Sequence, residues 1–103
     1  MGKPAGVFFS TGTQGGGQET TALSMVSTFV HHGMVFVPMG YSTPLVTNMD
    51  EIHGGSPWGP GTLAGPTGAR QPSQIEQDMA THYGGHFAAI AGMINVIEFG
   101  VCV

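Results

Sequence analysis

The 103-residue chain has very little positive charge. Lys3 and Arg70 are its two cationic side chains, against six Asp or Glu residues, so the formal net charge is −4. Proteins that bind nucleic acids or anionic membranes neutralise phosphates with many Lys and Arg residues, and the sequence therefore predicts neither partner. Charged residues of both signs make up 8% of the chain, against roughly 25% in average soluble domains. We therefore expect part of the surface to be covered by other protein.

Cysteine is also scarce, because Cys102 is the single copy. One cysteine excludes an internal disulfide and a cysteine-based metal cluster within the chain, and it fits a reducing, cytoplasmic compartment. The chain does not open with the basic and apolar regions of a secretory signal. Its longest apolar-leaning run, residues 87–103, contains Asn95 and Glu98 and is shorter than the roughly 20 residues that cross a bilayer. No membrane span is predicted.

Apolar patterning predicts a strand, a helix and a second strand near the N-terminus. Residues 7–9 are typical of a fully buried strand that ends at Ser10, and residues 34–37 repeat that pattern before Pro38. Between these runs, apolar residues recur at helical spacing, and Gly33 stands where such a helix would end. The spaced residues are Ala22, Met25, Val26, Phe29 and Val30. Strands joined by a crossover helix pair in parallel within one sheet, so the pattern predicts a βαβ unit of an α/β fold.

Residues 40–70 are rich in Gly and Pro, with seven of the 18 glycines and four of the seven prolines. The sequence predicts a long loop there, and such loops tend to be functional or to form interfaces. Two parallel strands and two helices leave apolar strand faces and open sheet edges. We therefore expect the chain to form part of a larger sheet.

A second helix is predicted after the Gly/Pro-rich segment. Ser73, with Glu76 three residues later, forms a capping box that starts this helix near Gln74. One face would carry Ile75, Met79, His82 and Tyr83. Gly84 and Gly85 weaken the helix, which resumes over residues 87–97.

The clearest signal for a ligand is the sequence Ser-Thr-Gly-Thr-Gln-Gly-Gly at residues 10–16, between the first strand and the first helix. Glycines let backbone N–H groups approach a ligand, hydroxyls and the Gln14 amide add neutral donors, and α/β folds bind ligands at the carboxyl ends of parallel strands. No lysine follows, so this is not a Walker A phosphate loop. On spacing alone, a binding loop and a flexible turn are equally supported.

Histidines give weaker signals. His31 and His32 close the first helix, where they either interact with the carbonyl end of the helix dipole or turn toward a site. His82 and His86 have the i, i+4 spacing of zinc ligands, but no carboxylate completes the set. No metal site is therefore predicted.

Three other side chains each allow two interpretations. Trp58 and Tyr41 either stack on a ligand or form a subunit contact, and such contacts are the commoner use of exposed aromatics. Arg70 pairs either with a phosphate or with Glu76. The residues alone do not decide between these roles.

Six short motifs occur in order between residues 3 and 92. They are Lys-Pro-Ala-Gly at 3–6, Ser-Thr-Gly-Thr through Gln-Glu-Thr-Thr at 10–21, His-His-Gly-Met at 31–34, Pro-Met-Gly-Tyr at 38–41, Gly-Gly-Ser-Pro-Trp-Gly at 54–59 and Arg-Gln-Pro-Ser at 70–73. Together they closely resemble the C-terminal half of the WrbA family of flavodoxin-like NAD(P)H:quinone oxidoreductases. The resemblance implies that residues 1–103 are the C-terminal part of one flavodoxin-like α/β domain with a parallel sheet.

The resemblance also implies a function. Members of this family are FMN enzymes, usually tetrameric, that reduce quinones with two electrons from NAD(P)H. Motif by motif, the loop of residues 10–16 matches the segment that wraps the flavin ring, and His31 matches the flavin-site histidine on the quinone-facing side. The implied cofactor-binding residues are Ser10, Thr11, Gly12, Thr13, Gln14, Gly15, Gly16 and His31.

The chain departs from the family pattern, because none of its segments matches the family's first strand and the hydroxyl-rich phosphate loop of that strand. We therefore expect a truncated form of the quinone oxidoreductase. The alternative is a non-catalytic fragment that associates with full-length homologues through residues 40–70. A third possibility is a chain without a stable fold, since each ordered residue must overcome about 1–2 kcal/mol of backbone entropy.

Overall fold

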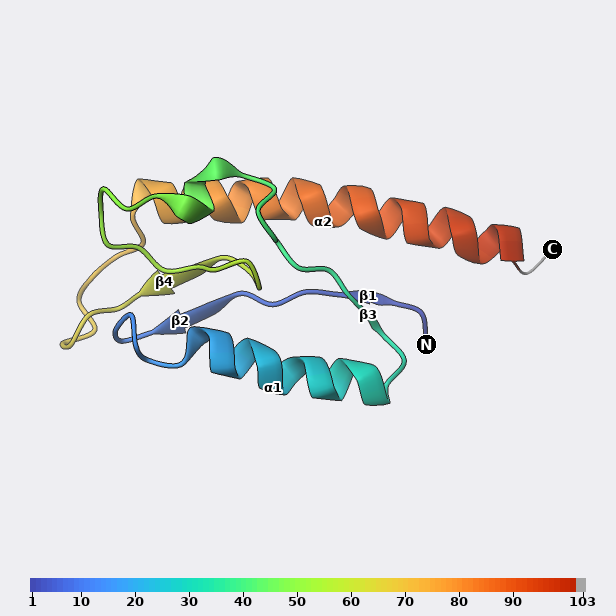
Figure 1. Ribbon diagram of the computed structural model, residues 1–103, viewed down its shortest axis with the longest axis horizontal. Helices are drawn as coiled ribbons and strands as arrows, with labels where there is room; N and C mark the ends of the chain where they lie inside the picture. The colour runs from blue at the N-terminus through green and yellow to red at the C-terminus, as the bar shows by residue number, and fades with distance from the viewer. Residues whose placement is uncertain (102–103) are drawn as a thin grey trace.

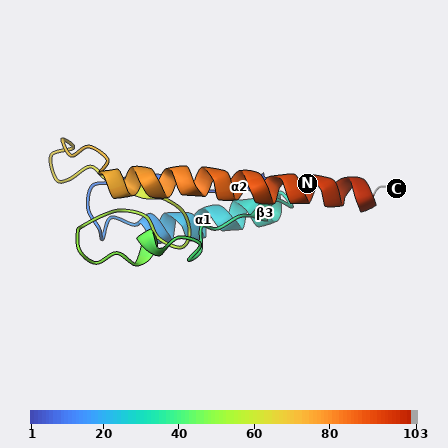
Figure 2. The same cartoon turned by 90° about the horizontal axis from the view of Figure 1, so that it is seen from above.

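The computed structural model describes residues 1–101 and the side chains of residues 1–94, so that Cys102 lies outside the described residues. The elements in chain order are β1 (Pro4–Ala5), β2 (Phe9–Thr11), α1 (Gln18–His31), β3 (Val35–Phe36), the 3-10 helix η1 (Pro44–Thr47), β4 (Gly61–Leu63) and α2 (Gln74–Val101). The strands lie between α1 and α2 (Figure 1). Seen from above, α2 runs over α1 in nearly the same direction (Figure 2). The α/β class with parallel strands is thereby confirmed.

All strand pairs are formed with the extended segment of residues 3–11. β1 pairs in parallel with β3, with Pro4 opposite Val35. β2 pairs in parallel with β4, with Phe9 opposite Gly61. Because α1 connects the segment to β3, the predicted order of strand, helix and parallel strand is confirmed, although the strand that pairs with β3 is Pro4–Ala5 and not residues 7–9.

The prediction of a fully buried strand at residues 7–9 was wrong. The structure assigns strand to Pro4–Ala5 and Phe9–Thr11 instead, and the side chain of Phe8 is 84% exposed. A run of apolar residues marks a strand that is suited to burial, but burial also needs a neighbour. Among the described residues, no element covers Phe8.

The prediction of a long loop over residues 40–70 was wrong at two places. Residues 44–47 form η1, and Gly61–Leu63 forms β4. The backbone N–H of Phe9 donates to the carbonyl of Pro60 at 3.2 Å. Because β4 is only three residues long and follows a proline, local patterning detects no alternation in it. Its pairing with a distant strand defines it as a strand.

Both helices begin or end at the predicted residues. Gly33 follows α1 with φ +67°, a left-handed conformation that favours glycine at a helix end. At the start of α2, the Ser73 N–H donates to Glu76 Oε1 at 2.8 Å, and the Glu76 N–H donates to Ser73 Oγ at 3.4 Å. The capping box is therefore confirmed. Gly84 and Gly85 do not interrupt α2, because packing of its apolar face compensates for their low helix propensity.

The core lies between α2 and the segment that follows β3. Met39, Ile75, Met79 and Tyr83 form one buried cluster, and the Tyr83 hydroxyl donates to the carbonyl of Val37 at 2.6 Å. This contact fixes α2 against the sheet. Over the part of the chain described, no helix is both long and apolar enough to cross a membrane.

Candidate functional site

The loop of residues 10–16 lies at the carboxyl end of β2 and leads into α1 (Figure 1). A turn closes it, because the Gly16 N–H donates to the carbonyl of Thr13 at 3.0 Å and the Thr11 hydroxyl donates to the same oxygen at 2.9 Å. Gly17 then caps α1 with φ 98°, which a residue with a Cβ adopts only with strain. The glycines of this motif thus shape the approach to the helix.

Gln18, the first residue of α1, anchors the base of the loop. Its side chain is 7% exposed. Its Nε2 donates to Thr11 Oγ1 at 3.1 Å and to the carbonyl of Thr62 at 2.9 Å, and its Oε1 accepts from the Gly55 N–H at 2.9 Å. One amide therefore ties the loop, β4 and the Gly/Pro-rich segment together.

Sequence reasoning missed the role of Gln18. The available signal was its position, because Gln18 lies one helical turn before Ala22 and so shares the buried face of α1. A polar side chain on a buried helix face needs hydrogen-bond partners. Its partners in β4 and at Gly55, however, are far away in the sequence.

Two hollows lie beside the loop. The first, about 230 Å³, is lined by Gln14, Gly15, Glu19 and His53 among others, and the second, about 430 Å³, extends from Gln14 and His53 along residues 46–52. No Lys or Arg lines either hollow within the described residues, whereas Glu19 lines the first and Asp50 and Glu51 line the second. The lining therefore suits a neutral polar group rather than a phosphate.

Glu76, which lies near the start of α2, holds the Gly/Pro-rich segment behind the first hollow. Its side chain is 3% exposed. The carboxylate accepts from the N–H of Gly54 (2.7 Å), the hydroxyl of Thr62 (3.0 Å), the N–H of Ser73 (2.8 Å) and Nη1 of Arg70 (3.0 Å). Burial alone raises the pKa of Glu76, but these donors outweigh it and lower the pKa to about 2. Arg70 is thus paired with Glu76. Of the two interpretations of Arg70, the structure therefore supports the pair with Glu76 and not the pair with a phosphate.

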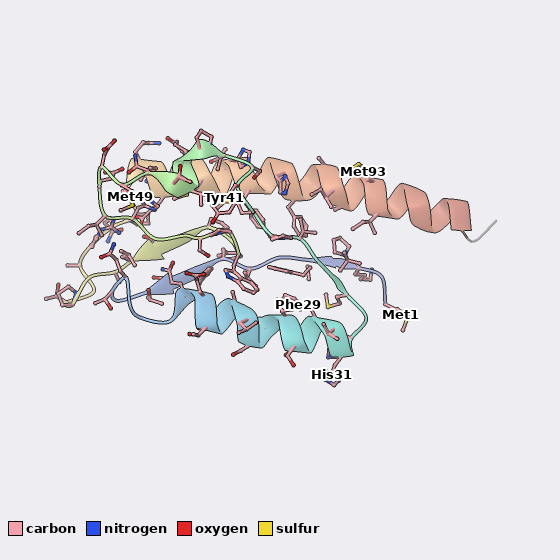
Figure 3. All side chains as sticks on the ribbon, in the orientation of Figure 1. Met1, Phe29, His31, Tyr41, Met49 and Met93 are labelled. Carbon is pink, nitrogen blue, oxygen red and sulfur yellow. The ribbon has the colours of Figure 1, made fainter. Side chains whose placement is uncertain are left out.

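His31 lies at the other end of α1 from the loop (Figure 3). The 14 residues of α1 span about 20 Å at ~1.5 Å per residue. The side chain of His31 is exposed. Within one chain, the structure therefore brings residues 10–16 together and does not bring His31 to them.

Of the two aromatics near the Gly/Pro-rich segment, Trp58 makes the more extensive contacts. Its Nε1 donates to Glu19 Oε2 at 3.1 Å, and its ring stacks on Phe36 with centroids 6.0 Å apart. Tyr41 is 75% exposed. Trp58 thus links α1 to β3, while Tyr41 is free to contact a partner.

The two histidines of α2 contact the chain instead of converging on a third ligand. Their rings stack with centroids 6.1 Å apart. His82 Nε2 lies 2.8 Å from Ser42 Oγ, and His86 Nε2 lies 3.2 Å from the carbonyl of Pro38. In the described part of the chain, no group of three His, Cys, Asp or Glu residues is placed to hold a metal ion.

Comparison with curated proteins identifies homologues. The chain is 57% identical over 95 residues to "Quinone-oxidoreductase QR2" of Triphysaria versicolor, which covers 91% of this chain and 46% of that protein. It is 57% identical over 88 residues to "NAD(P)H quinone oxidoreductase PST3" of Candida albicans, with coverage of 84% and 44%. It is 54% identical over 90 residues to "Probable NAD(P)H dehydrogenase (quinone) FQR1-like 2" of Arabidopsis thaliana, with coverage of 86% and 33%. No protein-family model matches the chain.

Two of these relatives are named as quinone oxidoreductases and the third as a probable NAD(P)H dehydrogenase (quinone), so the predicted similarity to quinone oxidoreductases is confirmed. The chain spans less than half the length of the curated relatives it matches. A match over 91% of the chain leaves out only the ends and therefore includes the loop of residues 10–16. The loop is thus part of the similarity.

Proposed function

We propose that this chain forms the flavin-ring-binding part of an FMN-dependent NAD(P)H:quinone oxidoreductase of the WrbA type, which acts in the cytoplasm as a homotetramer. The observation that carries the proposal is the 57% identity over 91% of the chain to a quinone oxidoreductase. The loop of residues 10–16, placed at the carboxyl end of β2, supports it independently. Ligands of α/β folds bind at such strand ends.

The donors of the loop fit the uncharged ring of FMN. Among the described residues, the N–H groups of Gly12, Thr13, Gln14 and Gly15 have no protein acceptor. They are free to donate to the oxygen and nitrogen atoms at the edge of a flavin ring. Without a cation in the adjacent hollows, these residues do not fit the FMN phosphate, which we assign to residues outside this chain.

When bound, FMN supplies the transfer of two electrons from NAD(P)H to a quinone. The residues of this chain orient the ring and hold the loop in one geometry. Gln18 ties the loop to β4, and Glu76 ties the opposite wall to α2. A preformed loop of this kind loses little conformational entropy on binding.

His31 is proposed to bound the quinone-facing side of the flavin. Because α1 separates His31 from the loop by about 20 Å, one chain does not present both to the same ring. In the proposed tetramer, the loop and the His31 side chain that contact one flavin come from different chains. The proposal therefore requires that catalysis and assembly occur together.

The test is an FMN titration of the purified 103-residue chain, followed by quenching of flavin fluorescence. We expect saturable binding at micromolar concentration. The Gln14→Ala variant removes an exposed amide that lines both hollows, and we expect about tenfold weaker binding, the value of one hydrogen bond to a ligand.

The matched control is Gln71→Ala, because Gln71 is an exposed glutamine that lines neither hollow, and we expect this variant to bind FMN like the unmodified chain. Equal losses in both variants would contradict the assignment of the loop. Absence of FMN binding would contradict flavin binding by the chain alone and favour the second candidate function.

That second candidate is a non-catalytic chain that associates with full-length homologues through residues 40–70. A specific observation favours it, because this segment carries large apolar side chains in water. Tyr41 is 75%, Met49 92% and Ile52 63% exposed, and Figure 3 shows Tyr41 and Met49 on this segment. Copurification with a full-length relative tests it, and a chain that stays alone contradicts it.

A further inference from the structure

Two partly buried histidines lie one helical turn apart on α2. His82 and His86 are four positions apart, which places their side chains on one face of the helix. Their rings are nearly parallel, at 15°, with centroids 6.1 Å apart. Gly84 and Gly85 lie between them, and α2 is continuous across both glycines. The folded chain therefore keeps the spacing of two metal ligands on a helix.

The hydrogen bonds of the two rings determine which ring nitrogen carries the proton. The carbonyl of Pro38, 3.2 Å from His86 Nε2, only accepts, so this Nε2 is a donor. Ser42 Oγ lies 2.8 Å from His82 Nε2 and already donates its one hydrogen to the carbonyl of Met39 at 2.7 Å. The Ser42 oxygen therefore accepts from His82. In both neutral rings, the lone pair is thus left on Nδ1.

Histidines that bind metals have this arrangement of hydrogen bonds. A histidine that binds a metal through one ring nitrogen usually donates the N–H of the other nitrogen to a fixed oxygen, which orients the ring and raises its basicity. His86 donates to a backbone carbonyl, and His82 donates to a hydroxyl. Both Nδ1 atoms are therefore available to an ion without the loss of either hydrogen bond.

The surroundings of the pair leave room for an ion and favour its charge. A Cβ added at Gly84 or at Gly85 would meet no atom within 4 Å, so no other side chain crowds this turn. Asp78 lies one turn before His82 on the same face of α2. The formal net charge of the chain is −4. A cation is therefore attracted to this part of the helix.

We propose that His82 and His86 form a site for one divalent transition-metal ion of the Zn²⁺ and Cu²⁺ class, held by the two Nδ1 atoms. Imidazole nitrogen suits these ions, whereas Mg²⁺ and Ca²⁺ prefer oxygen ligands. No third protein ligand is placed nearby among the described residues, so water completes the coordination. At a metal–nitrogen distance of about 2.0–2.1 Å, two ligand nitrogens lie at most about 4 Å apart, and the rings therefore tilt toward each other on binding.

The ion would join the two ends of the helical turn that contains Gly84 and Gly85. Glycine has a low helix propensity, so this turn gains from a link between its ends. In the unfolded chain the two rings are not held one turn apart. The ion therefore binds the folded chain more tightly and stabilises it. None of these residues belongs to the loop of residues 10–16, so the site is independent of the proposed function.

The test is calorimetric titration of the chain with Zn²⁺ at neutral pH. Every sample carries Cys102→Ser, because a cysteine thiolate also binds Zn²⁺. We expect one ion per chain. His82→Gln and His86→Gln should each weaken binding about tenfold or more, because the second ligand of a chelate acts at a high effective concentration. Cu²⁺ should bind more tightly than Zn²⁺, and Mg²⁺ should not bind.

Two controls separate the pair from histidines in general. His32→Gln removes an exposed histidine that follows α1 and should leave the affinity unchanged. Gly84→His combined with His86→Gln keeps the number of histidines but places them two positions apart, on different faces of the helix. This double variant should bind Zn²⁺ as weakly as His86→Gln.

Urea denaturation and nitrogen NMR give two further readouts. Saturating Zn²⁺ should raise the urea midpoint of the chain that keeps both histidines and leave that of His86→Gln unchanged, which also shows that the variant folds. On addition of Zn²⁺, the Nδ1 resonances of His82 and His86 should shift more than their Nε2 resonances.

Several results would overturn the proposal. They are no binding of Zn²⁺ or Cu²⁺, an affinity that His86→Gln does not change, full affinity in the double variant, or Zn²⁺ shifts confined to Nε2 or to other histidines. None of these measurements needs a flavin. A chain that binds Zn²⁺ but not FMN therefore contradicts the proposed function alone, and the opposite result contradicts the metal site alone.

Discussion

Replacement of the buried carboxylate of Glu76 should reveal how much one side chain stabilises the fold. Glu76 is 3% exposed and accepts hydrogen bonds from Gly54, Thr62, Arg70 and Ser73. Its pKa falls from 4.5 to about 2, and each pKa unit corresponds to about 1.4 kcal/mol. The carboxylate therefore contributes about 3 kcal/mol to the free energy of unfolding at neutral pH.

The sign of the pH dependence follows from the lowered pKa. Because the unfolded chain binds the proton more tightly than the folded one, the stabilisation is complete above about pH 5 and is lost as the pH falls toward 2. Glu76→Gln keeps the shape of the side chain but removes the charge. We expect the free energy of unfolding of the variant to be about 3 kcal/mol lower than that of the unmodified chain at pH 7. At pH 2 we expect the two values to be nearly equal.

Urea denaturation at pH 7 and at pH 2 measures both differences. The control is Asp78→Asn on the same helix, where an exposed carboxylate accepts from Gln74 Nε2 at 2.8 Å. We expect this change to cost less than about 0.5 kcal/mol. A loss below about 1 kcal/mol for Glu76→Gln at pH 7, or a loss that does not shrink at pH 2, would refute the reasoning.

Two further substitutions test contacts that hold the site and the core. Gln18→Leu leaves the Gly55 N–H without its acceptor and takes one donor from the Thr62 carbonyl, so urea denaturation should show a loss of about 2–3 kcal/mol; a loss no larger than that of Gln71→Leu would contradict the anchoring role. Gly6→Ala places a Cβ against the Tyr83 hydroxyl. The substitution should therefore lower the free energy of unfolding more in the unmodified chain than in a Tyr83→Phe variant. Equal effects in this double-mutant cycle would show that the hydroxyl is not the obstacle.

Local sequence signals predicted the helices well because their determinants lie within one or two turns. The capping box needs only Ser73 and Glu76, which are three residues apart and bond to each other. Gly33 ends α1 through its own backbone conformation. Such features are set by neighbours in the sequence, so patterning is sufficient to place them.

Features that depend on distant partners escaped the sequence analysis. β4 is a strand because Gly61 lies opposite Phe9, and Gln18 is an anchor because Gly55 and Thr62 surround it. The exposure of Phe8 was mispredicted for the same reason, since an apolar run does not reveal whether its neighbour is present. In the candidate site, the flavin-binding roles of residues 10–16 and of His31 both stay predictions.

The parallel pairing of the sheet also governs the order in which the chain becomes structured during synthesis. Pro4 pairs with Val35, and Phe9 pairs with Gly61, so the first strand emerges from the ribosome long before either partner. At roughly 5–20 residues per second, residues 3–11 wait for seconds with their backbone groups unpaired. Non-local parallel pairing is slow to form and exposes apolar strands to aggregation. The topology therefore leaves residues 3–11 open to aggregation until both partner strands have been synthesised.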